Sequence, residues 1–161
     1  VCTGSGCIAI TLKHLFPDHT ITASDISDKA GEVFTYNSLH ILGWIIPFRV
    51  SDLFSTIEGP FDVIVSNPPY LTKNEVSNMK ALNWPEPEQA LNGGDYGLDL
   101  IERLIQESVP ALSPNGYVVI EAASWQMEEI KKCMAKNGFI SIIIKKDIAG
   151  RDRVIIGRKN L

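Results

Sequence analysis

The chain has 161 residues, of which 45% are hydrophobic and 21% charged, a composition that predicts one globular domain over residues 1–161 and excludes a disordered or fibrous protein. A net charge of -4 argues against a domain that grips a nucleic-acid backbone through a basic face. Three cysteines without metal-ligand spacing, and no apolar stretch near the roughly 20 residues of a membrane span, predict a cytoplasmic protein with no metal site, disulfide framework or membrane segment.

The first half of the chain alternates helical and strand patterns. Pro17 ends the first expected helix, Ser27 is a candidate N-cap for the second, and Gly43 ends that helix. Pro47 indicates an irregular or edge strand, because proline has no N–H to donate. The expected elements are a Gly-rich turn over 2–6, a helix over 7–16, a strand over 20–24 that runs into Asp25, a helix over 27–42, and strands over 45–50 and 61–66.

The second half begins with a long irregular segment over 71–95, for which the sequence predicts a loop with a short helix near 74–82. The remaining expected elements are a helix over 98–112 closed by a turn at 114–116, a strand over 117–122, a helix over 126–136, and strands over 139–145 and 153–158. The last two strands are too close for an intervening helix and should pair antiparallel. The pattern predicts a doubly wound, Rossmann-like α/β sheet with ligands at the carboxyl ends of its strands.

The Gly-rich turn Thr3-Gly4-Ser5-Gly6 precedes a helix, and its glycines allow the backbone to approach a ligand closely. Asp25 follows at the end of the next strand, where a carboxylate can accept hydrogen bonds from both hydroxyls of a ribose. These features predict a nucleotide-type cofactor. The same glycines satisfy the Gly-x-Gly-x-x-Ala form of a nicotinamide-cofactor site, so an oxidoreductase remains an alternative at this point.

The tetrapeptide Asn67-Pro68-Pro69-Tyr70 ends a predicted buried strand. Its two prolines remove two N–H donors, which leaves the Asn67 side-chain oxygen and the Pro68 carbonyl as acceptors for a substrate NH2 group. Tyr70 can cover a planar group with its ring. Such a site can direct the nitrogen lone pair at an electrophilic methyl group without a strong base, and this favours methyl transfer over hydride transfer.

These residues resemble the PrmC/HemK family of release-factor glutamine methyltransferases, and the resemblance covers nearly the whole chain. It rests on the Gly-rich turn, on Asn67-Pro68-Pro69-Tyr70, and on the segments Asp25-Ile26-Ser27, Ser51-Asp52-Leu53-Phe54, Ala90-Leu91-Asn92-Gly93-Gly94-Asp95-Tyr96-Gly97-Leu98-Asp99 and Asp147-Ile148-Ala149-Gly150-Arg151-Asp152-Arg153-Val154. The resemblance implies the class I fold that uses S-adenosylmethionine and releases S-adenosylhomocysteine. It also implies that residues 1–161 are the catalytic domain, without the family's N-terminal helical domain and without the strand that should run into Cys2. We therefore expect this piece to bind the cofactor poorly unless that strand is supplied.

The resemblance assigns roles to individual residues. The expected cofactor contacts are Thr3, Gly4, Gly6, Asp25, Ile26, Asp52, Leu53 and Asn67. The expected substrate contacts are Asn67, Pro68, Pro69 and Tyr70, of which Asn67, Pro68 and Tyr70 are the expected catalytic group. The implied substrate is the glutamine of the Gly-Gly-Gln motif in peptide-chain release factors, and nucleic acid is not expected as a direct substrate.

Two other functions remain open from the sequence. The Asn-Pro-Pro-Tyr motif is shared with adenine-N6 methyltransferases that act on DNA or RNA, and a fragment could dock release factor without turnover. Four further residues have no assigned role. Glu121 lies at the end of a predicted strand and could touch the site, but its position favours a surface or capping carboxylate. Trp84 is either a lid over the substrate or a loop residue packed on the core, and Arg151 with Arg153 is either a loop clamp or a partner contact.

Overall fold

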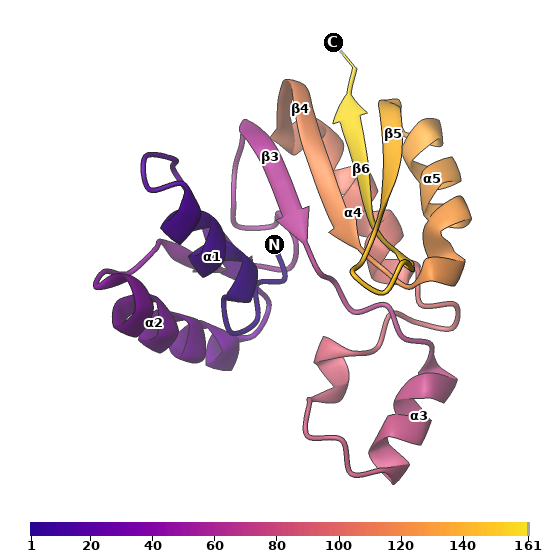
Figure 1. Cartoon of the computed structure of the whole chain (residues 1–161), viewed down its shortest axis with the longest axis horizontal. Coiled ribbons are helices and arrows are strands. Elements are labelled where there is room, and N and C mark those ends of the chain that lie inside the picture. Colours follow the sequence, from indigo (N-terminus) through magenta and orange to yellow (C-terminus); the bar gives the residue numbers. More distant parts are fainter. Residues whose placement is uncertain (161) are drawn as a thin grey trace. The chain divides into compact units, whose positions relative to one another are not determined.

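The computed structural model describes residues 1–160, and the chain divides into two compact units, Val1–Glu58 and a second that begins at Gly59 (Figure 1). Both units combine helices with strands, and the α/β class predicted from the sequence is confirmed. Among the described residues, no helix combines the length and apolar character needed to cross a membrane.

The first unit is built on two short parallel strands that pack against helices. Its elements are α1 (Cys7–Leu15), β1 (Ala23–Asp25), α2 (Asp28–Leu42) and β2 (Phe48–Val50), and β1 pairs with β2. The core residues are apolar side chains from all parts of the unit: Ala9, Ile10, Ala23, Phe34 and Ile46. The predicted caps of the second helix are confirmed, since the Ser27 hydroxyl accepts from the Ala30 N–H at 3.2 Å and Gly43 ends α2 with a φ of 82°.

The second unit holds a four-stranded sheet in the order β3-β4-β6-β5 (Figure 1). Its strands are β3 (Phe61–Ser66), β4 (Leu112–Glu121), β5 (Phe139–Lys146) and β6 (Asp152–Lys159), and its helices are α3 (Lys73–Ala81), α4 (Asp99–Ala111), α5 (Met127–Lys136) and the short 3-10 turns η1 (Glu88–Ala90) and η2 (Ser124–Gln126). β3 pairs parallel with β4, whereas β6 is antiparallel to both of its neighbours. The predicted antiparallel pair at the end of the chain is therefore confirmed.

The helices α4 and α5 contact each other and the sheet, and their buried faces supply much of the core of this unit. The apolar face of α4 is fully buried at Ile101, Leu104 and Ile105. The matching face of α5 is buried at Ile130 and Met134, whose exposed fraction is at most 1%. The i, i+3 and i+4 spacing of these apolar residues places them on one helix face, which is why both helices fold onto the sheet.

Three predicted boundaries are wrong. The strands expected over 20–24 and 45–50 are only three residues each, Ala23–Asp25 and Phe48–Val50. The Pro47 carbonyl accepts from the Ala23 N–H at 2.9 Å, but Pro47 has no N–H to extend the ladder toward earlier residues. The turn expected at 114–116 lies within β4, where the register against β3 shifts between Phe61 and Val63 and Asn115 has a φ of 62°.

The strand expected before Cys2 stays a prediction. Within residues 1–160, β1 pairs with β2 alone and β3 with β4 alone, so each has one strand neighbour.

The irregular segment over 71–95 contains α3, the short helix that the sequence predicted. Thr72 and Glu75 form a capping box at the start of this helix.

Candidate functional site

The Gly-rich turn of the first unit lies against the carboxyl end of β1. The Thr3 N–H donates to the Ser24 carbonyl at 3.0 Å, and the Gly4 N–H donates to Oδ2 of Asp25 at 2.8 Å. The other carboxylate oxygen, Oδ1, accepts from the Ser27 N–H at 3.0 Å. One half-buried carboxylate therefore joins the turn, the end of β1 and the start of α2, and each of its oxygens keeps a lone pair for a ligand.

The two glycines of the turn have different surroundings. A Cβ on Gly6, at φ 97°, would lie 2.6 Å from Cδ2 of Phe34 and 2.8 Å from Cδ1 of Ile10. A Cβ on Gly4, at φ 53°, would have no atom within 4 Å among its described surroundings. Gly6 is thus required by the packing of α1 against the core, whereas Gly4 faces open space.

We expect Gly6→Ala to destabilise the chain by roughly 2 to 4 kcal/mol, because it combines a left-handed backbone with overpacking against Phe34. Gly4→Ala is the matched control, since it meets only the backbone cost of about 1 to 2 kcal/mol. Urea unfolding of the two variants measures the difference. Equal losses of stability would contradict the packing role given to Gly6.

The first turn of α1 has no side-chain cap, since its N-cap residue is Gly6. The leading N–H groups of a helix have no partner within the helix and carry a partial positive charge, so they suit an anionic or polar ligand. Gly4 opens the space beside this terminus. The turn therefore fits the polar end of a nucleotide-type cofactor.

A second turn follows β2 and contains Asp52 and Leu53. The Ser51 N–H donates to the Asp25 carbonyl at 2.8 Å, so this turn starts beside the end of β1. The Ser55 hydroxyl accepts from the Asp52 N–H at 3.1 Å, and Leu53 is 3% exposed with a φ of 47°. A buried leucine in the left-handed region is uncommon and marks a turn whose shape the surroundings enforce. The structure thus brings Asp25 and Asp52, both expected cofactor contacts, to the same edge of the β1–β2 pair.

In the second unit, β3 ends at Ser66 and the Asn67-Pro68-Pro69-Tyr70 motif follows at its carboxyl end. Asn67 is exposed, and within residues 1–160 no hydrogen bond engages its side chain, whereas Pro68 is buried. The motif therefore presents the asparagine amide to a ligand from a fixed backbone, because two prolines restrict the chain that carries it.

Tyr70 is half-buried and lies near charged groups. Burial of the phenol raises the pKa of Tyr70 above its ordinary value, the carboxylate of Glu121 raises this pKa further, and Arg153 opposes the rise. The phenol consequently stays neutral at physiological pH. Glu121, the last residue of β4, is thus an electrostatic neighbour of the motif, whereas the sequence favoured a surface or capping role for it.

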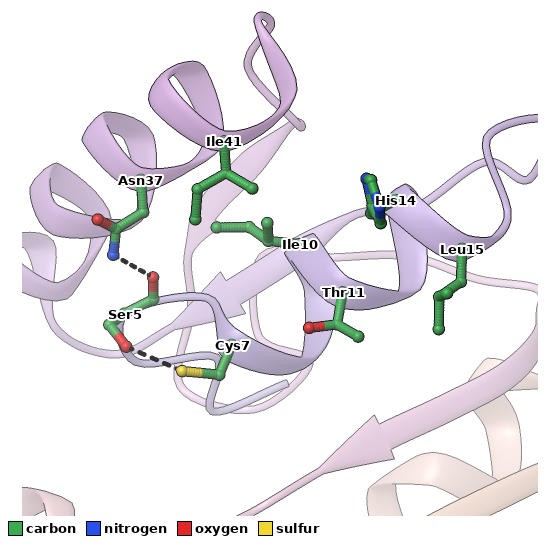
Figure 2. A pocket seen from close by; sticks show the side chains of 8 residues that line it. All are labelled: Ser5, Cys7, Ile10, Thr11, His14, Leu15, Asn37 and Ile41. Atoms are coloured by element: carbon green, nitrogen blue, oxygen red, sulfur yellow. Dashed lines mark hydrogen bonds between the residues drawn. The ribbon is translucent and has the colours of Figure 1, made fainter.

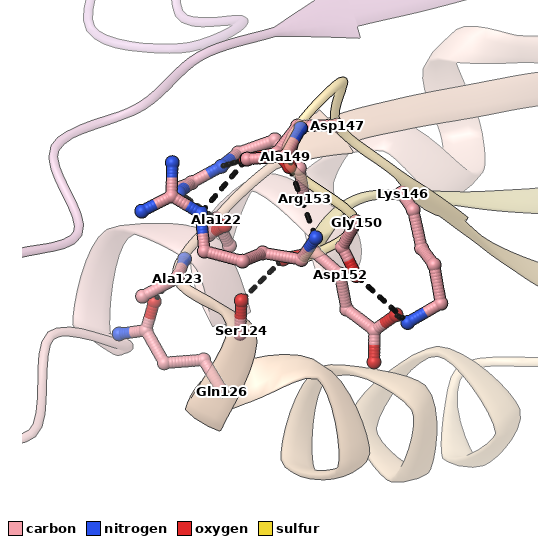
Figure 3. A network of polar contacts seen from close by, with 11 residues as sticks. Ala122, Ala123, Ser124, Gln126, Lys146, Asp147, Ala149, Gly150, Asp152 and Arg153 are labelled. Atoms are coloured by element: carbon pink, nitrogen blue, oxygen red, sulfur yellow. Dashed lines mark hydrogen bonds and ion pairs between the residues drawn. The ribbon is translucent and has the colours of Figure 1, made fainter.

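The loop between β5 and β6 is held together by Asp147 (Figure 3). Its carboxylate lies 3.2 Å from Nε of Arg151 and 3.6 Å from Nε of Arg153, and the Arg151 backbone hydrogen bond is the largest cause that lowers the pKa of Asp147. Nη1 of Arg153 also donates to the Ala122 carbonyl at 3.3 Å. These contacts favour the loop-clamp interpretation of the two arginines.

Trp84 is 50% exposed and its indole N–H donates to the Glu86 carboxylate at 3.2 Å, so it is not a packed core residue.

Sequence reasoning missed Gln126. This side chain is fully buried and donates to the carbonyl of Tyr70 at 3.0 Å. The one available signal was its spacing, because Gln126 lies four residues before Ile130 on the buried face of an apolar helix pattern. A polar residue on such a face needs a partner, and here the partner is the motif itself.

A groove of about 320 Å³ lies between α1 and α2 (Figure 2). Ser5 borders it, with its carbonyl accepting from Nδ2 of Asn37 at 2.9 Å and its hydroxyl 3.5 Å from Sγ of Cys7. None of the expected cofactor or substrate contacts lines this groove.

Among the described residues, no group of three or more His, Cys, Asp or Glu side chains could hold a metal ion.

The family model described as "Methyltransferase small domain" matches residues 1–84, which is more than half of the chain. The chain belongs to this methyltransferase family. The relatives include the ribosomal protein uL3 glutamine methyltransferase of Francisella tularensis, which is 41% identical over 83% of this chain and 43% of its own length. The release factor glutamine methyltransferase of Koribacter versatilis is 37% identical over 98% of this chain and 56% of its own length.

The resemblance to release-factor glutamine methyltransferases is confirmed by the K. versatilis relative and by three others with the same name, which are 34% to 36% identical over at least 97% of this chain. The chain spans about half the length of the curated relatives it matches. Among solved structures, a ribosomal protein L11 methylase from Lactobacillus delbrueckii subsp. bulgaricus aligns with a TM-score of 0.72. It is 21% identical and covers 99% of this chain and 67% of its own. This likeness agrees with the predicted fold, whose antiparallel strand pair is present as β5 and β6. Because the chain belongs to a methyltransferase family, the oxidoreductase alternative is set aside.

Proposed function

We propose that this methyltransferase domain transfers a methyl group from S-adenosylmethionine to the side-chain amide nitrogen of a glutamine in a protein. The observation that carries the proposal is the Asn67-Pro68-Pro69-Tyr70 motif at the carboxyl end of β3. The Asn67 side chain is exposed, and within residues 1–160 its amide makes no hydrogen bond. A glutamine amide carries two N–H donors, and the motif offers acceptors without competing backbone donors at its prolines.

The cofactor contacts that we propose lie in the first unit, apart from Asn67. The uncapped start of α1 and the open space at Gly4 fit the methionine end, and Asp25 fits the ribose hydroxyls. Asp52 and Leu53, in the turn after β2, are proposed to contact the adenine, with Thr3, Gly6 and Ile26 completing the set. When bound, S-adenosylmethionine supplies an electrophilic methyl group on a positively charged sulfur.

The residues of the motif have separate roles in this proposal. Oδ1 of Asn67 and the Pro68 carbonyl each accept one N–H of the glutamine amide, which orients the nitrogen lone pair outward from the amide plane. The neutral Tyr70 ring packs on the planar amide. As the nitrogen–methyl bond forms, the methyl–sulfur bond breaks and S-adenosylhomocysteine is the leaving group. The nitrogen gives its proton to water only after this bond has formed, so positioning supplies most of the acceleration and no strong base is needed.

The proposed substrate is the glutamine of the Gly-Gly-Gln motif in peptide-chain release factors. Relatives named release factor glutamine methyltransferase match 97% to 99% of this chain. A glutamine of ribosomal protein uL3 is the second candidate, because the F. tularensis relative named for it is 41% identical. Both candidates present the same chemical group to Asn67.

The test is transfer of labelled methyl from S-adenosylmethionine by the complete natural protein. The acceptors are a release factor, the same factor with its Gly-Gly-Gln glutamine changed to alanine, uL3, and adenine-containing DNA and RNA. We expect label on the intact release factor and none on its alanine variant. Label on uL3 alone would select the second candidate, and label on nucleic acid alone would mean that Asn67 holds an adenine amine.

A further inference from the structure

Gln126, the last residue of η2, lies fully buried where the chain leaves β4 and enters α5. Its Nε2 donates to the carbonyls of Tyr70 at 3.0 Å and Gly97 at 2.9 Å, with a longer contact of 3.4 Å to the Tyr96 carbonyl. Its Oε1 accepts from the Ala123 N–H at 3.0 Å, and Figure 3 shows these two residues beside each other. One side chain therefore joins the end of the motif, the segment before α4 and the end of β4.

The chemistry of this position fits an amide better than other side chains. Two N–H donors face carbonyl oxygens while one acceptor faces an N–H, so every polar atom of Gln126 is paired. A carboxylate of the same shape would place an oxygen against the carbonyls of Tyr70 and Gly97, and an apolar side chain would leave those buried carbonyls without this donor.

The segments that Gln126 joins are also packed closely against each other. A Cβ on Gly97, at φ 67°, would lie 2.2 Å from the Tyr70 carbonyl oxygen and 2.6 Å from Nε2 of Gln126. A Cβ on Gly93 would lie 2.8 Å from the Pro69 carbonyl oxygen. Only glycine allows this approach, so the 93–97 segment forms a rigid backing behind the second half of the motif.

Backbone hydrogen bonds hold the same contact from the other side. The Leu71 N–H donates to the Leu91 carbonyl at 2.9 Å, and the Gly93 N–H donates to the Leu71 carbonyl at 2.8 Å. The residue after Tyr70 is thus fixed by a short ladder, and Tyr70 itself is fixed by Gln126.

We propose that Gln126 is a positioning residue that holds Tyr70, and through it the acceptors of Asn67 and Pro68, in the geometry that methyl transfer requires. The inference rests on the proposed function of the motif. Gln126 acts through the Tyr70 carbonyl, not on the substrate. Loss of the Gln126 side chain should lower kcat with little effect on the affinity for S-adenosylmethionine. Asn67 is the one proposed cofactor contact that Gln126 would hold, and all the others lie in the first unit.

The first test is Gln126→Glu in the complete natural protein. At pH 8 we expect a fall in kcat of roughly 10- to 100-fold, since small misplacements of a reacting group have effects of this size. Burial raises the pKa of the introduced carboxyl, and its protonated form regains one O–H donor for the carbonyls, so part of the lost kcat should return as the pH falls toward 6. Gln106→Glu, at an exposed position of α4, is the matched control with the same charge change.

The second test is amide hydrogen exchange at Leu71 and Gly93, which needs no activity. We expect exchange about tenfold faster or more in Gln126→Glu than in the control, because loss of the clamp lowers the local opening free energy. Gln126→Asn, which keeps the donors but is too short to reach, serves if Gln126→Glu does not fold. Unchanged exchange, or faster exchange with an unchanged kcat, would overturn the inference. A wild-type protein that methylates no glutamine would overturn the proposed function instead, while the exchange result would still decide whether Gln126 holds Tyr70.

Discussion

Asn67→Ala should lower kcat for glutamine methylation by about 10²- to 10³-fold, the loss typical for a preorganised hydrogen-bonding group at a reacting centre. Asn67 is exposed and has no hydrogen bond within the described residues, so its removal should change the free energy of unfolding by less than about 0.5 kcal/mol. The defect should therefore be chemical. Single-turnover transfer of labelled methyl to release factor, with cofactor affinity from calorimetry, separates the two effects.

A second substitution isolates the acceptor that Asn67 supplies. Asn67→Asp keeps an oxygen in the same place, so we expect it to retain more activity than Asn67→Ala. Asn160→Ala, at an exposed position after β6, controls for the loss of an asparagine elsewhere in the second unit. Equal losses in the alanine and aspartate variants would contradict the acceptor role, and a loss confined to cofactor affinity would make Asn67 a cofactor contact only.

The elements that the sequence predicted well carry their signals locally. The β3 strand has the predicted bounds because a run of Val and Ile lies between Pro60 and the Asn67-Pro68 pair. The α2 helix agrees because Ser27 and Gly43 supply its caps. In both cases the residues that decide the boundary lie within the element or next to it.

The boundaries that the sequence predicted wrongly depend on pairing partners. Pro47 limits β1 as well as β2, although it lies more than twenty residues beyond β1 in the chain, because the two strands form one ladder. Residues 114–116 look like a turn, yet they continue β4 through a register shift that its pairing with β3 accommodates. Local patterns do not encode which strand will be the neighbour.

The candidate site divides in the same way. The sequence identifies Asn67, Pro68 and Tyr70 because the motif is contiguous, and it identifies Asp25 from its place at a strand end. The spacing of Gln126 from Ile130 could have indicated that this side chain is buried. It could not have identified the partners, because Tyr70 lies 56 positions and Gly97 lies 29 positions away in the chain. The groups proposed to touch substrate were predictable, and the group that holds them in place was not.

Asp25→Asn should weaken S-adenosylmethionine binding by roughly 10- to 100-fold, because a hydrogen bond to a charged group contributes about 1.5 to 3 kcal/mol. The substitution also replaces one acceptor oxygen by an NH2 group. That group must face the N–H of Gly4 or of Ser27, which now donate to the carboxylate at 2.8 Å and 3.0 Å. We therefore expect the Gly-rich turn to loosen together with the loss of affinity.

Calorimetric titration of the complete natural protein with S-adenosylmethionine and with S-adenosylhomocysteine measures the first effect, and hydrogen exchange at the Gly4 amide measures the second. Asp28→Asn, at the exposed start of α2, makes the same charge change without touching the turn and should leave both quantities near wild type. The two effects of the substitution can be measured separately. Faster exchange at Gly4 with an unchanged affinity would mean that Asp25 has a structural role only. Weaker binding with unchanged exchange would mean that the carboxylate acts on the ribose directly and that the turn does not depend on it.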